Sequence, residues 1–157
     1  MDAHRSRRAA ESLIAVPPRP TLVVIDTSVV LPACVAGGLR FTGNFHWLAP
    51  SLLWSEVVSA LHEATWRDEL TAEEAAAARV VFAELPLQAV DSAAVRDEAW
   101  AIADELGLAK TYDAEFLALA RLRGALFVTA DARLRRGADR LGFVVDPVEL
   151  QTRAARA

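Results

Sequence analysis

Short apolar runs alternate along the chain with longer segments in which apolar residues recur at helical spacing. The runs are Thr21–Ile25, Leu87–Val90, Leu126–Thr129 and Phe143–Val145, with His46–Ala49 as a further candidate for a brief extended segment. Runs of this kind, rich in β-branched residues, are typical of strands buried on both faces of a parallel sheet. Because helical segments separate them, the pattern predicts an α/β fold with a central parallel sheet of four to five short strands and helices on both faces.

The segments between these runs carry recognisable helix signals. Apolar residues from position 51 to position 70 follow helical spacing. Thr71 and Glu74 have the spacing of a capping box, which starts a helix that extends to about Glu84. Pro32 is expected to disturb the first helix, since proline removes a backbone donor from a helix interior. Further helices are expected at residues 27–36, 92–106, 111–123, 132–141 and from 147 onward.

The first twenty residues differ from the rest of the chain. They contain four arginines and three prolines, and no apolar core like that of a signal peptide follows the arginines. We therefore expect a disordered tail at residues 1–20 and a single domain over residues 21–157. No apolar run reaches the ~18 residues that span a bilayer. A single cysteine, Cys34, excludes an internal disulfide, so the sequence predicts a cytoplasmic protein.

The formal net charge of −4 conceals an uneven distribution along the chain. Residues 55–115 hold fourteen acids and four bases, whereas residues 116–157 hold eight arginines and four acids. Electrostatic attraction to phosphate acts over about one Debye length, ~8–10 Å, so the local balance matters more than the average. The charge pattern permits an RNA partner without requiring one.

Two aspartates follow predicted strands directly. In parallel α/β sheets ligands bind beyond the carboxyl ends of the strands, and Asp26 and Asp131 both lie at such ends. The alternative interpretation for each is an N-cap of the next helix, because aspartate is a favoured capping residue. Asp91 and Asp146 also follow strands, and capping explains them better.

Two further acids lie on predicted helices. Glu56 flanks the apolar stripe of its helix, where a lone carboxylate is costly to bury, although it could also reach to water. Asp113 lies in a first turn, where the helix dipole favours an anion by ~0.3–1 kcal/mol. No histidine or cysteine cluster accompanies these acids. Carboxylates alone indicate a hard cation such as Mg²⁺ or Mn²⁺, which would relieve their repulsion and activate water.

Four segments together resemble the successive signatures of PIN domains, in particular those of bacterial VapC toxins. They are Val23-Val-Ile-Asp-Thr-Ser28, Ala49-Pro-Ser-Leu-Leu-Trp-Ser-Glu-Val57, Tyr112-Asp-Ala-Glu-Phe-Leu-Ala-Leu-Ala120 and Thr129-Ala-Asp131. The segments occur in the order of the family, and the similarity extends from about Thr21 to Pro147. The tail before it and Pro32 in the first helix are departures from the family pattern.

The resemblance implies a Rossmann-like PIN fold, a homodimer, and cleavage of RNA phosphodiester bonds that depends on Mg²⁺ or Mn²⁺. It also implies a cognate VapB-like antitoxin whose C-terminal segment blocks the acidic site. The metal-binding and catalytic acids of the family match Asp26, Glu56, Asp113 and Asp131. The hydroxyl residues that support those acids match Ser28 and Thr129.

Three other functions are compatible with parts of this pattern. A PIN nuclease with a housekeeping RNA-processing role would carry the same motifs, and a non-catalytic binding module would keep the fold without needing all four acids. An enzyme of the haloacid dehalogenase type needs a second aspartate where this chain has Ser28. On the substrate side, Arg133, Arg135 and Arg136 are candidates for binding flanking phosphates, with a solvated helix face as the alternative.

The four tryptophans and the 54% hydrophobic content are generous for a chain of this size. Large aromatic residues are enriched at the centres of interfaces. We therefore expect a homodimer and an exposed apolar groove that an antitoxin covers. The outer face of the 51–70 helix, near Trp54 and Trp66, is the candidate surface; burial of all four tryptophans in the core is the alternative.

Overall fold

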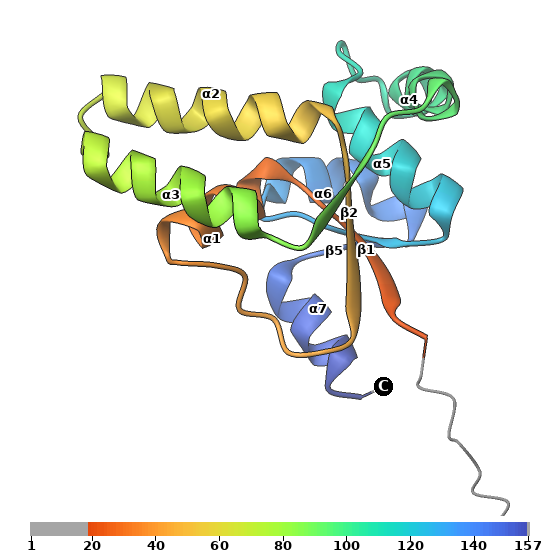
Figure 1. The fold of residues 1–157 in the computed structure, drawn as a ribbon. Coiled ribbons are helices and arrows are strands. Elements are labelled where there is room, and N and C mark those ends of the chain that lie inside the picture. The colour runs from red at the N-terminus through yellow and green to blue at the C-terminus, as the bar shows by residue number, and fades with distance from the viewer. Residues whose placement is uncertain (1–18, 157) are drawn as a thin grey trace, which may run out of the picture.

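A five-stranded parallel sheet forms the centre of the protein (Figure 1). The structure, a computed structural model, describes residues 19–156, so most of the expected tail at residues 1–20 lies outside the described residues. The strands are β1 (Thr21–Ile25), β2 (Phe45–Pro50), β3 (Leu87–Val90), β4 (Leu126–Val128) and β5 (Val144–Val145), in the order β3-β2-β1-β4-β5. The predicted α/β fold with a parallel sheet is confirmed.

The seven α-helices described occupy the segments between and after the strands. They are α1 (Thr27–Val35), α2 (Leu52–Trp66), α3 (Ala72–Glu84), α4 (Ala93–Leu106), α5 (Tyr112–Arg123), α6 (Ala132–Ala138) and α7 (Pro147–Ala154), and a 3-10 turn, η1 (Asp139–Leu141), follows α6. The capping box of α3 forms as predicted, with Glu74 N donating to Thr71 Oγ1 and Thr71 N donating to the Glu74 carboxylate.

Three local predictions differ from the structure in extent. The candidate strand at His46–Ala49 is a full interior strand, β2, because it pairs with β1 on one side and β3 on the other. Pro32 does not interrupt α1, whose buried residues Val30 and Cys34 hold it against the core. α2 ends at Trp66 rather than position 70, since Asp68 adopts a positive φ of 56° that stops the helix.

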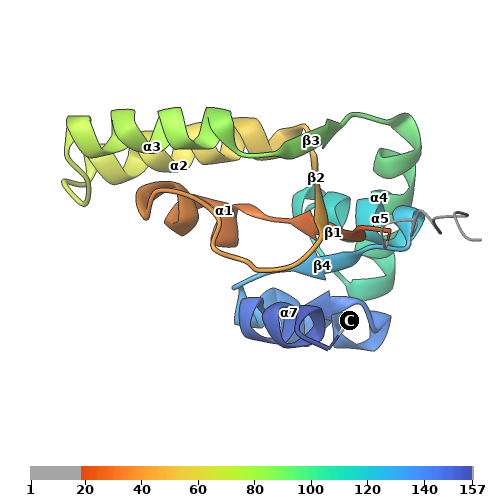
Figure 2. The same cartoon turned by 60° about the horizontal axis from the view of Figure 1, so that its bottom comes forward.

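Helices cover the sheet in layers. α5 packs against β1, β2 and β4, and α4 packs on α5. α1, α2 and α3 pack on one another, and the α2–α3 pair projects beyond the sheet as an arm (Figures 1 and 2). Consecutive crossovers from β1 lead toward β3, whereas those from β4 lead toward β5. The strand order therefore reverses between β1 and β4, and such a switch point is where open α/β sheets bind ligands.

The tryptophans divide between the core and the surface. Trp47 is buried, and Trp54 packs on Phe82 with ring centroids 5.9 Å apart. Trp66 is 82% exposed and Trp100 is 68% exposed, so the alternative that all four lie in the core is wrong. None of the helices within residues 19–156 is long and apolar enough to cross a membrane.

Candidate metal centre

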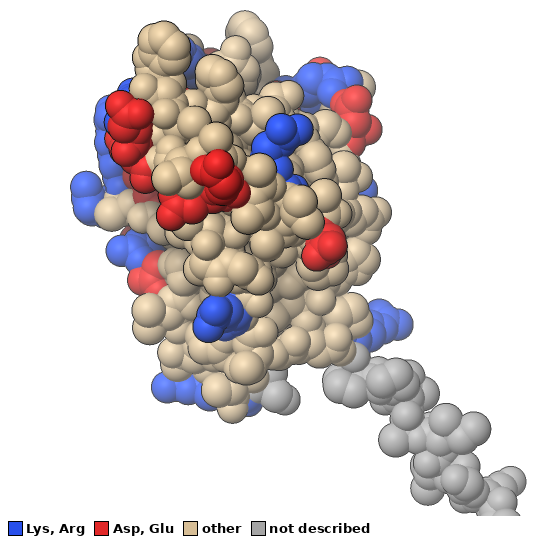
Figure 3. Space-filling view, turned by 60° about the vertical axis from the view of Figure 1, so that its left-hand side comes forward, with Lys and Arg blue, Asp and Glu red and all other residues tan. Residues whose placement is uncertain are grey.

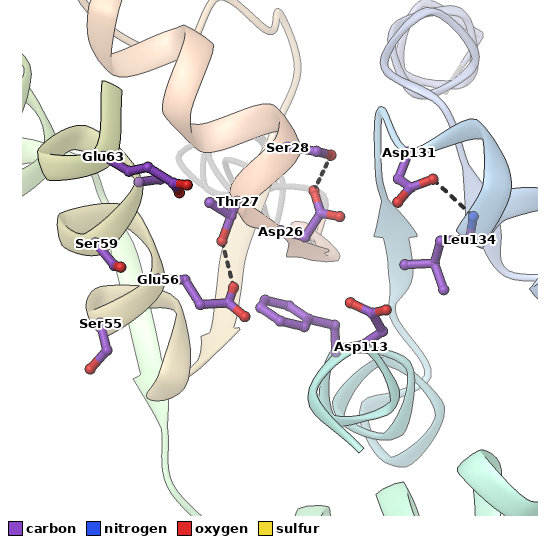
Figure 4. A pocket seen from close by; sticks show the side chains of 12 residues that line it. Asp26, Thr27, Ser28, Ser55, Glu56, Ser59, Glu63, Asp113, Asp131 and Leu134 are labelled. Carbon is purple, nitrogen blue, oxygen red and sulfur yellow. Dashed lines mark hydrogen bonds between the residues drawn. The ribbon is translucent and has the colours of Figure 1, made fainter. Parts of the chain in front are cut away.

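A cavity of about 530 Å³ opens at the switch point between β1 and β4. All four acids singled out from the sequence line it, although they come from four different elements (Figure 4). Glu63 of α2 is a fifth acid on its wall, and the hydroxyl residues Thr27, Ser28, Ser55 and Ser59 line it as well. The sheet and its connections thus bring together side chains that are far apart in the sequence.

Asp26 is the most deeply placed of these acids, with 8% of its surface exposed. It occupies the N-cap position of α1 but makes no capping hydrogen bond. Instead its two carboxylate oxygens accept hydrogen bonds from Ser28 Oγ at 2.6 Å and Thr129 Oγ1 at 2.7 Å. Burial raises the pKa of Asp26, and hydrogen bonds from the two hydroxyls and from the backbone of Val29 and Ser28 oppose that rise. The capping interpretation of Asp26 therefore describes only part of what its side chain does.

Ser28 and Thr129 connect the carboxyl ends of β1 and β4. Besides donating to Asp26, Ser28 Oγ accepts from Ala130 N at 2.9 Å, and Thr129 Oγ1 accepts from Asp131 N at 3.0 Å. The two hydroxyls lie 3.3 Å apart. Each of them is thus held by at least one donor and one acceptor, so the orientation of the buried carboxylate is strongly determined.

Glu56 enters the cavity from the opposite side, on α2. Its Oε2 atom accepts a hydrogen bond from Thr27 Oγ1 at 2.6 Å (Figure 4). Partial burial raises the pKa of Glu56; the Thr27 hydrogen bond opposes this effect, and the negative charges of Asp113 and Asp26 add to it. The second carboxylate oxygen has no hydrogen-bond partner within residues 19–156 and is available to a ligand.

Asp113 and Asp131 complete the cavity from α5 and from the turn before α6. Although Asp113 as a residue is exposed, partial desolvation of its carboxyl group raises its pKa, and the charge of Asp131 adds to the effect. Asp131 does cap α6, because its Oδ1 accepts from Arg133 N at 2.8 Å and Leu134 N at 3.0 Å. Capping employs one oxygen and leaves the other free, so the capping and ligand interpretations of Asp131 are compatible.

The charge of the cavity is strongly negative. Its lining contains five acids and no lysine, arginine or histidine. Glu63 is neutralised by an ion pair with Arg67, whereas no salt bridge involves the other four within the part of the chain that the structure describes. Unpaired carboxylates that share a cavity repel one another, and an oxygen-rich donor set of this kind suits Mg²⁺ or Mn²⁺ rather than zinc.

The four carboxylates line one cavity without converging on a single point. Within residues 19–156, no three histidine, cysteine or acidic side chains form a group already arranged to hold an ion. Mg²⁺ usually keeps several of its waters and binds through one or two protein carboxylates. The donor set therefore fits a partly hydrated cation better than a cage made only of protein ligands.

The remaining candidates from the sequence lie elsewhere. Arg135 forms an ion pair with Asp146, which also caps α7 through Glu149 N at 2.7 Å. Asp91 pairs with Arg96 and is not the cap of α4, whose N-cap residue is Ser92. Of the three candidate arginines, only Arg133 lines a cavity next to the acidic one, whereas Arg136 lies on the exposed surface of α6.

Sequence reasoning assigned no role to Thr27, Ser55 or Ser59. Thr27 was visible only as the residue after Asp26, and its contact with Glu56 spans 29 positions along the chain. Ser55 and Ser59 lie one helical turn apart on the α2 face that carries Glu56 and Glu63. Their spacing of four residues, which repeats from Ser55 to Glu63, is a helix-face signal that could have been found.

Comparisons with known proteins agree with this architecture. The sequence model of the PIN domain family matches residues 23–140, more than half of the chain. No curated protein sequence matches the chain. A crystal structure of a protein from Pyrobaculum aerophilum is similar with a TM-score of 0.66 and 18% identity, covering 88% of this chain and 100% of that one. A toxin–antitoxin complex from Klebsiella pneumoniae gives 0.55 and 17%, covering 78% and 95%.

Proposed function

The chain belongs to the PIN domain family, and from this premise we propose that it is a divalent-metal-dependent endoribonuclease. The observation that carries the proposal is the cavity at the switch point, which is lined by five acids and no base. Such a cavity would repel a phosphate backbone unless a cation lay between them. A metal-dependent phosphodiesterase resolves this conflict, because the same cation would attract both the carboxylates and the phosphate.

We assign the cation to Asp26, Glu56, Asp113 and Asp131. Raised pKa values support this assignment for three of them, because attraction to a bound cation would offset the repulsion and the desolvation cost that cause the rise. Ser28 and Thr129 orient Asp26, and Thr27 orients Glu56. The preference for Mg²⁺ or Mn²⁺ rests on the oxygen-only donor set.

Asp26 and Glu56 have different roles in the proposed reaction. When bound, the cation lowers the pKa of a water molecule and offsets negative charge on the phosphate. Asp26 supplies a carboxylate of fixed orientation, held by two hydroxyls. Thr27 holds one oxygen of the Glu56 carboxylate, so the other oxygen could contact the cation or a water molecule bound to it.

A cleavage assay tests the proposal. Purified protein is incubated with single-stranded RNA and, separately, single-stranded DNA in Mg²⁺, in Mn²⁺ and in EDTA. We expect internal cleavage of RNA that requires the cation and is lost in Glu56→Gln. The matched control, Glu84→Gln, changes an exposed acid outside the cavity and should cut normally. Cleavage that persists in EDTA, or that both variants retain, would contradict the proposal.

We further propose that the nuclease is the toxin of a toxin–antitoxin pair. The similarity of its four motifs to VapC toxins supports this, and the complex from Klebsiella pneumoniae shares its fold. Figure 3, which brings the left-hand side of Figure 1 forward, shows that charged side chains are sparse over much of this face. Exposed Val58, Trp66 and Val80 on α2 and α3 supply apolar surface for a VapB-like antitoxin.

Inducible expression in the host distinguishes a toxin from a housekeeping nuclease. A toxin should arrest growth, and co-expression of the protein encoded beside it should restore growth. Glu56→Gln should be harmless without that protein. Undisturbed growth on expression of a chain that cuts RNA in vitro would favour the housekeeping role.

A homodimer is the third part of the proposal. It is supported by the exposure of Trp66 and Trp100, which cost free energy while they face water. Sedimentation at micromolar concentration should give the mass of two chains, and Trp66→Glu or Trp100→Glu should produce a monomer. A monomeric wild-type protein would contradict the prediction.

A further inference from the structure

A second cavity, of about 640 Å³, adjoins the acidic one. Asp113, Asp131 and Leu134 line both cavities, so the two are continuous across these residues. The walls differ in charge, because the second cavity adds Lys110 and Arg133 to the two aspartates. Positively charged side chains therefore line the cavity next to the acidic one.

The side chains of Lys110 and Arg133 have no ion-pair or hydrogen-bond partner within residues 19–156. Lys110 precedes Asp113 by three residues, and Arg133 follows Asp131 by two, so both are held near the acidic centre by their own backbone. Two neighbouring arginines are already engaged, since Arg121 pairs with Glu98 and Glu105, and Arg135 pairs with Asp146. Arg136 of α6 has no ion pair but lines neither cavity. Lys110 and Arg133 thus face a cavity where one anion could contact both.

The rest of the second cavity is apolar and open. Leu106, Leu108 and Leu134 supply hydrocarbon surface, and Gly107 and Gly137 leave the wall without side chains. Gly137 lies inside α6, where glycine costs ~1 kcal/mol relative to alanine. A Cβ atom at this position would meet nothing within 4 Å, so packing does not require glycine there. The cavity thus offers hydrocarbon surface for the base or sugar of a nucleotide and two cations, Lys110 and Arg133, for its phosphate.

The wall on the other side of the acidic centre has a different character. There α2 presents Ser55, Ser59 and Glu63 and no cation to the cavity. Arg67, which follows that helix, forms an ion pair with Glu63. Among the residues that line the two cavities, the cations that could bind a second phosphate therefore lie on the α6 side.

We propose that the second cavity binds the nucleotide adjacent to the scissile phosphate, with Lys110 and Arg133 contacting its phosphate and Leu106 and Leu108 contacting its base or sugar. The inference rests on the proposed function, because it takes the acidic cavity as the place of cleavage. The RNA strand would then be bound by cations on only one side of the acidic cavity, the side of α6. Arg133 is then a substrate-binding residue, whereas Arg135 and Arg136 are not.

Binding measured without cleavage tests the subsite. The binding assay uses the full-length protein with Glu56→Gln, which is expected not to cut RNA. Glu56 lines only the first cavity, so this change leaves the lining of the second cavity intact. The protein is titrated in Mg²⁺ into fluorescein-labelled single-stranded RNA at several KCl concentrations. Lys110→Ala and Arg133→Ala, added singly and together, should weaken binding several-fold each. Each should also reduce the slope of log K against log [KCl] by about 0.7, the value for one phosphate contact on a single strand.

Arg136→Ala is the matched control. Arg136 is an exposed cation on the same helix, without an ion pair, and it lines neither cavity. It should leave both affinity and slope nearly unchanged, although it alters the net charge as much as Arg133→Ala does. An equal loss in all three variants would mean general attraction to a basic surface and would overturn the subsite.

Gly137→Trp tests the cavity without changing its charge. Gly137 lines the cavity of about 640 Å³, and a Cβ atom there would meet nothing within 4 Å. The tryptophan should therefore occupy the cavity and weaken RNA binding, while Gly137→Ala should bind RNA as before. Circular dichroism confirms that both variants are folded. If the wild-type protein cuts RNA but none of these changes affects binding, the subsite alone is wrong. If the wild-type protein neither binds nor cuts RNA, the proposed function fails with it.

Discussion

The aspartates that follow the central strands and those that follow the edge strands have opposite surroundings. Asp26 and Asp131 follow β1 and β4 in the middle of the sheet and line a cavity without a base. Asp91 and Asp146 follow β3 and β5 at its two edges, and each forms an ion pair with an arginine. Burial raises the pKa of Asp26, whereas hydrogen bonds from the α7 backbone and from Arg135 lower the pKa of Asp146.

All four positions look alike in sequence, as an aspartate just after an apolar run. The difference arises from what the strand order places beside them. At the edges a nearby arginine can reach the carboxylate from solvent, and the acid then stabilises the fold. At the switch point two strand ends meet and bring acids together, and the carboxylates are left for a ligand. Position in the sheet, rather than local sequence, separates the two kinds of aspartate.

The largest expected contrast is in catalysis. Asp26→Asn should reduce RNA cleavage at least about 100-fold, because even residues that only support metal ligands often cost 10–100-fold. Asp146→Asn should cut RNA normally, since asparagine still caps a helix and the site is elsewhere. Initial rates in saturating Mg²⁺ measure both. Similar rates in the two variants would erase the distinction between central and edge aspartates.

A smaller effect is expected at Thr27, which touches the centre only through Glu56. Thr27→Val keeps the shape of the side chain but removes the hydrogen bond to Glu56. Affinity for Mn²⁺, followed by titration of the cleavage rate, should fall about 10-fold, the lower end of the effect of supporting residues. Thr152→Val removes an exposed hydroxyl in α7 and is the control. Unchanged Mn²⁺ affinity in Thr27→Val would show that Thr27 does not position Glu56.

The two kinds of aspartate should also differ in stability when no cation is present. Asp146→Ala removes the cap of α7 and its ion pair, and should lower the free energy of unfolding by about 1 kcal/mol. Asp113→Ala relieves repulsion from Asp131 and should raise the free energy of unfolding. Urea unfolding at pH 7 in EDTA measures both changes. Destabilisation by both variants would mean that repulsion within the cavity is too weak to matter.

The smallest and most specific contrast is in pH dependence. A raised pKa in the folded state makes ionised Asp113 destabilising above that pKa, so the benefit of Asp113→Asn should disappear as the pH falls below the ordinary value of 3.8. A lowered pKa makes ionised Asp146 stabilising above 3.8, and this contribution is lost as the pH falls through the folded-state pKa. The two differences from wild type should therefore have opposite signs at pH 7 and converge in acid. A parallel pH dependence would contradict the assigned causes.

The sequence was most informative where the signal is local or follows from topology. The β1 run and the capping box of α3 depend on neighbouring residues. The shared position of Asp26 and Asp131 follows from the rule on strand ends, and the resemblance to PIN domains added Glu56 and Asp113. Contacts between side chains far apart in the sequence could not be predicted from it. The Thr27–Glu56 hydrogen bond and the Arg135–Asp146 ion pair depend on the positions in which the helices pack against the sheet. The end of α2 depends on a single backbone angle at Asp68.

The hydrogen bond between Thr129 and Asp26 joins residues 103 positions apart. Because the chain is made from its N-terminus, Asp26, Glu56 and Asp113 emerge from the ribosome before β4, which pairs with the end of β1. A nascent chain therefore holds most of the carboxylates but lacks the neighbour that orients the deepest one. Long-range pairing of this kind is also slow to form. The orientation of Asp26 is thus completed only after the segment that carries β4 and Thr129 is available to pair with the end of β1.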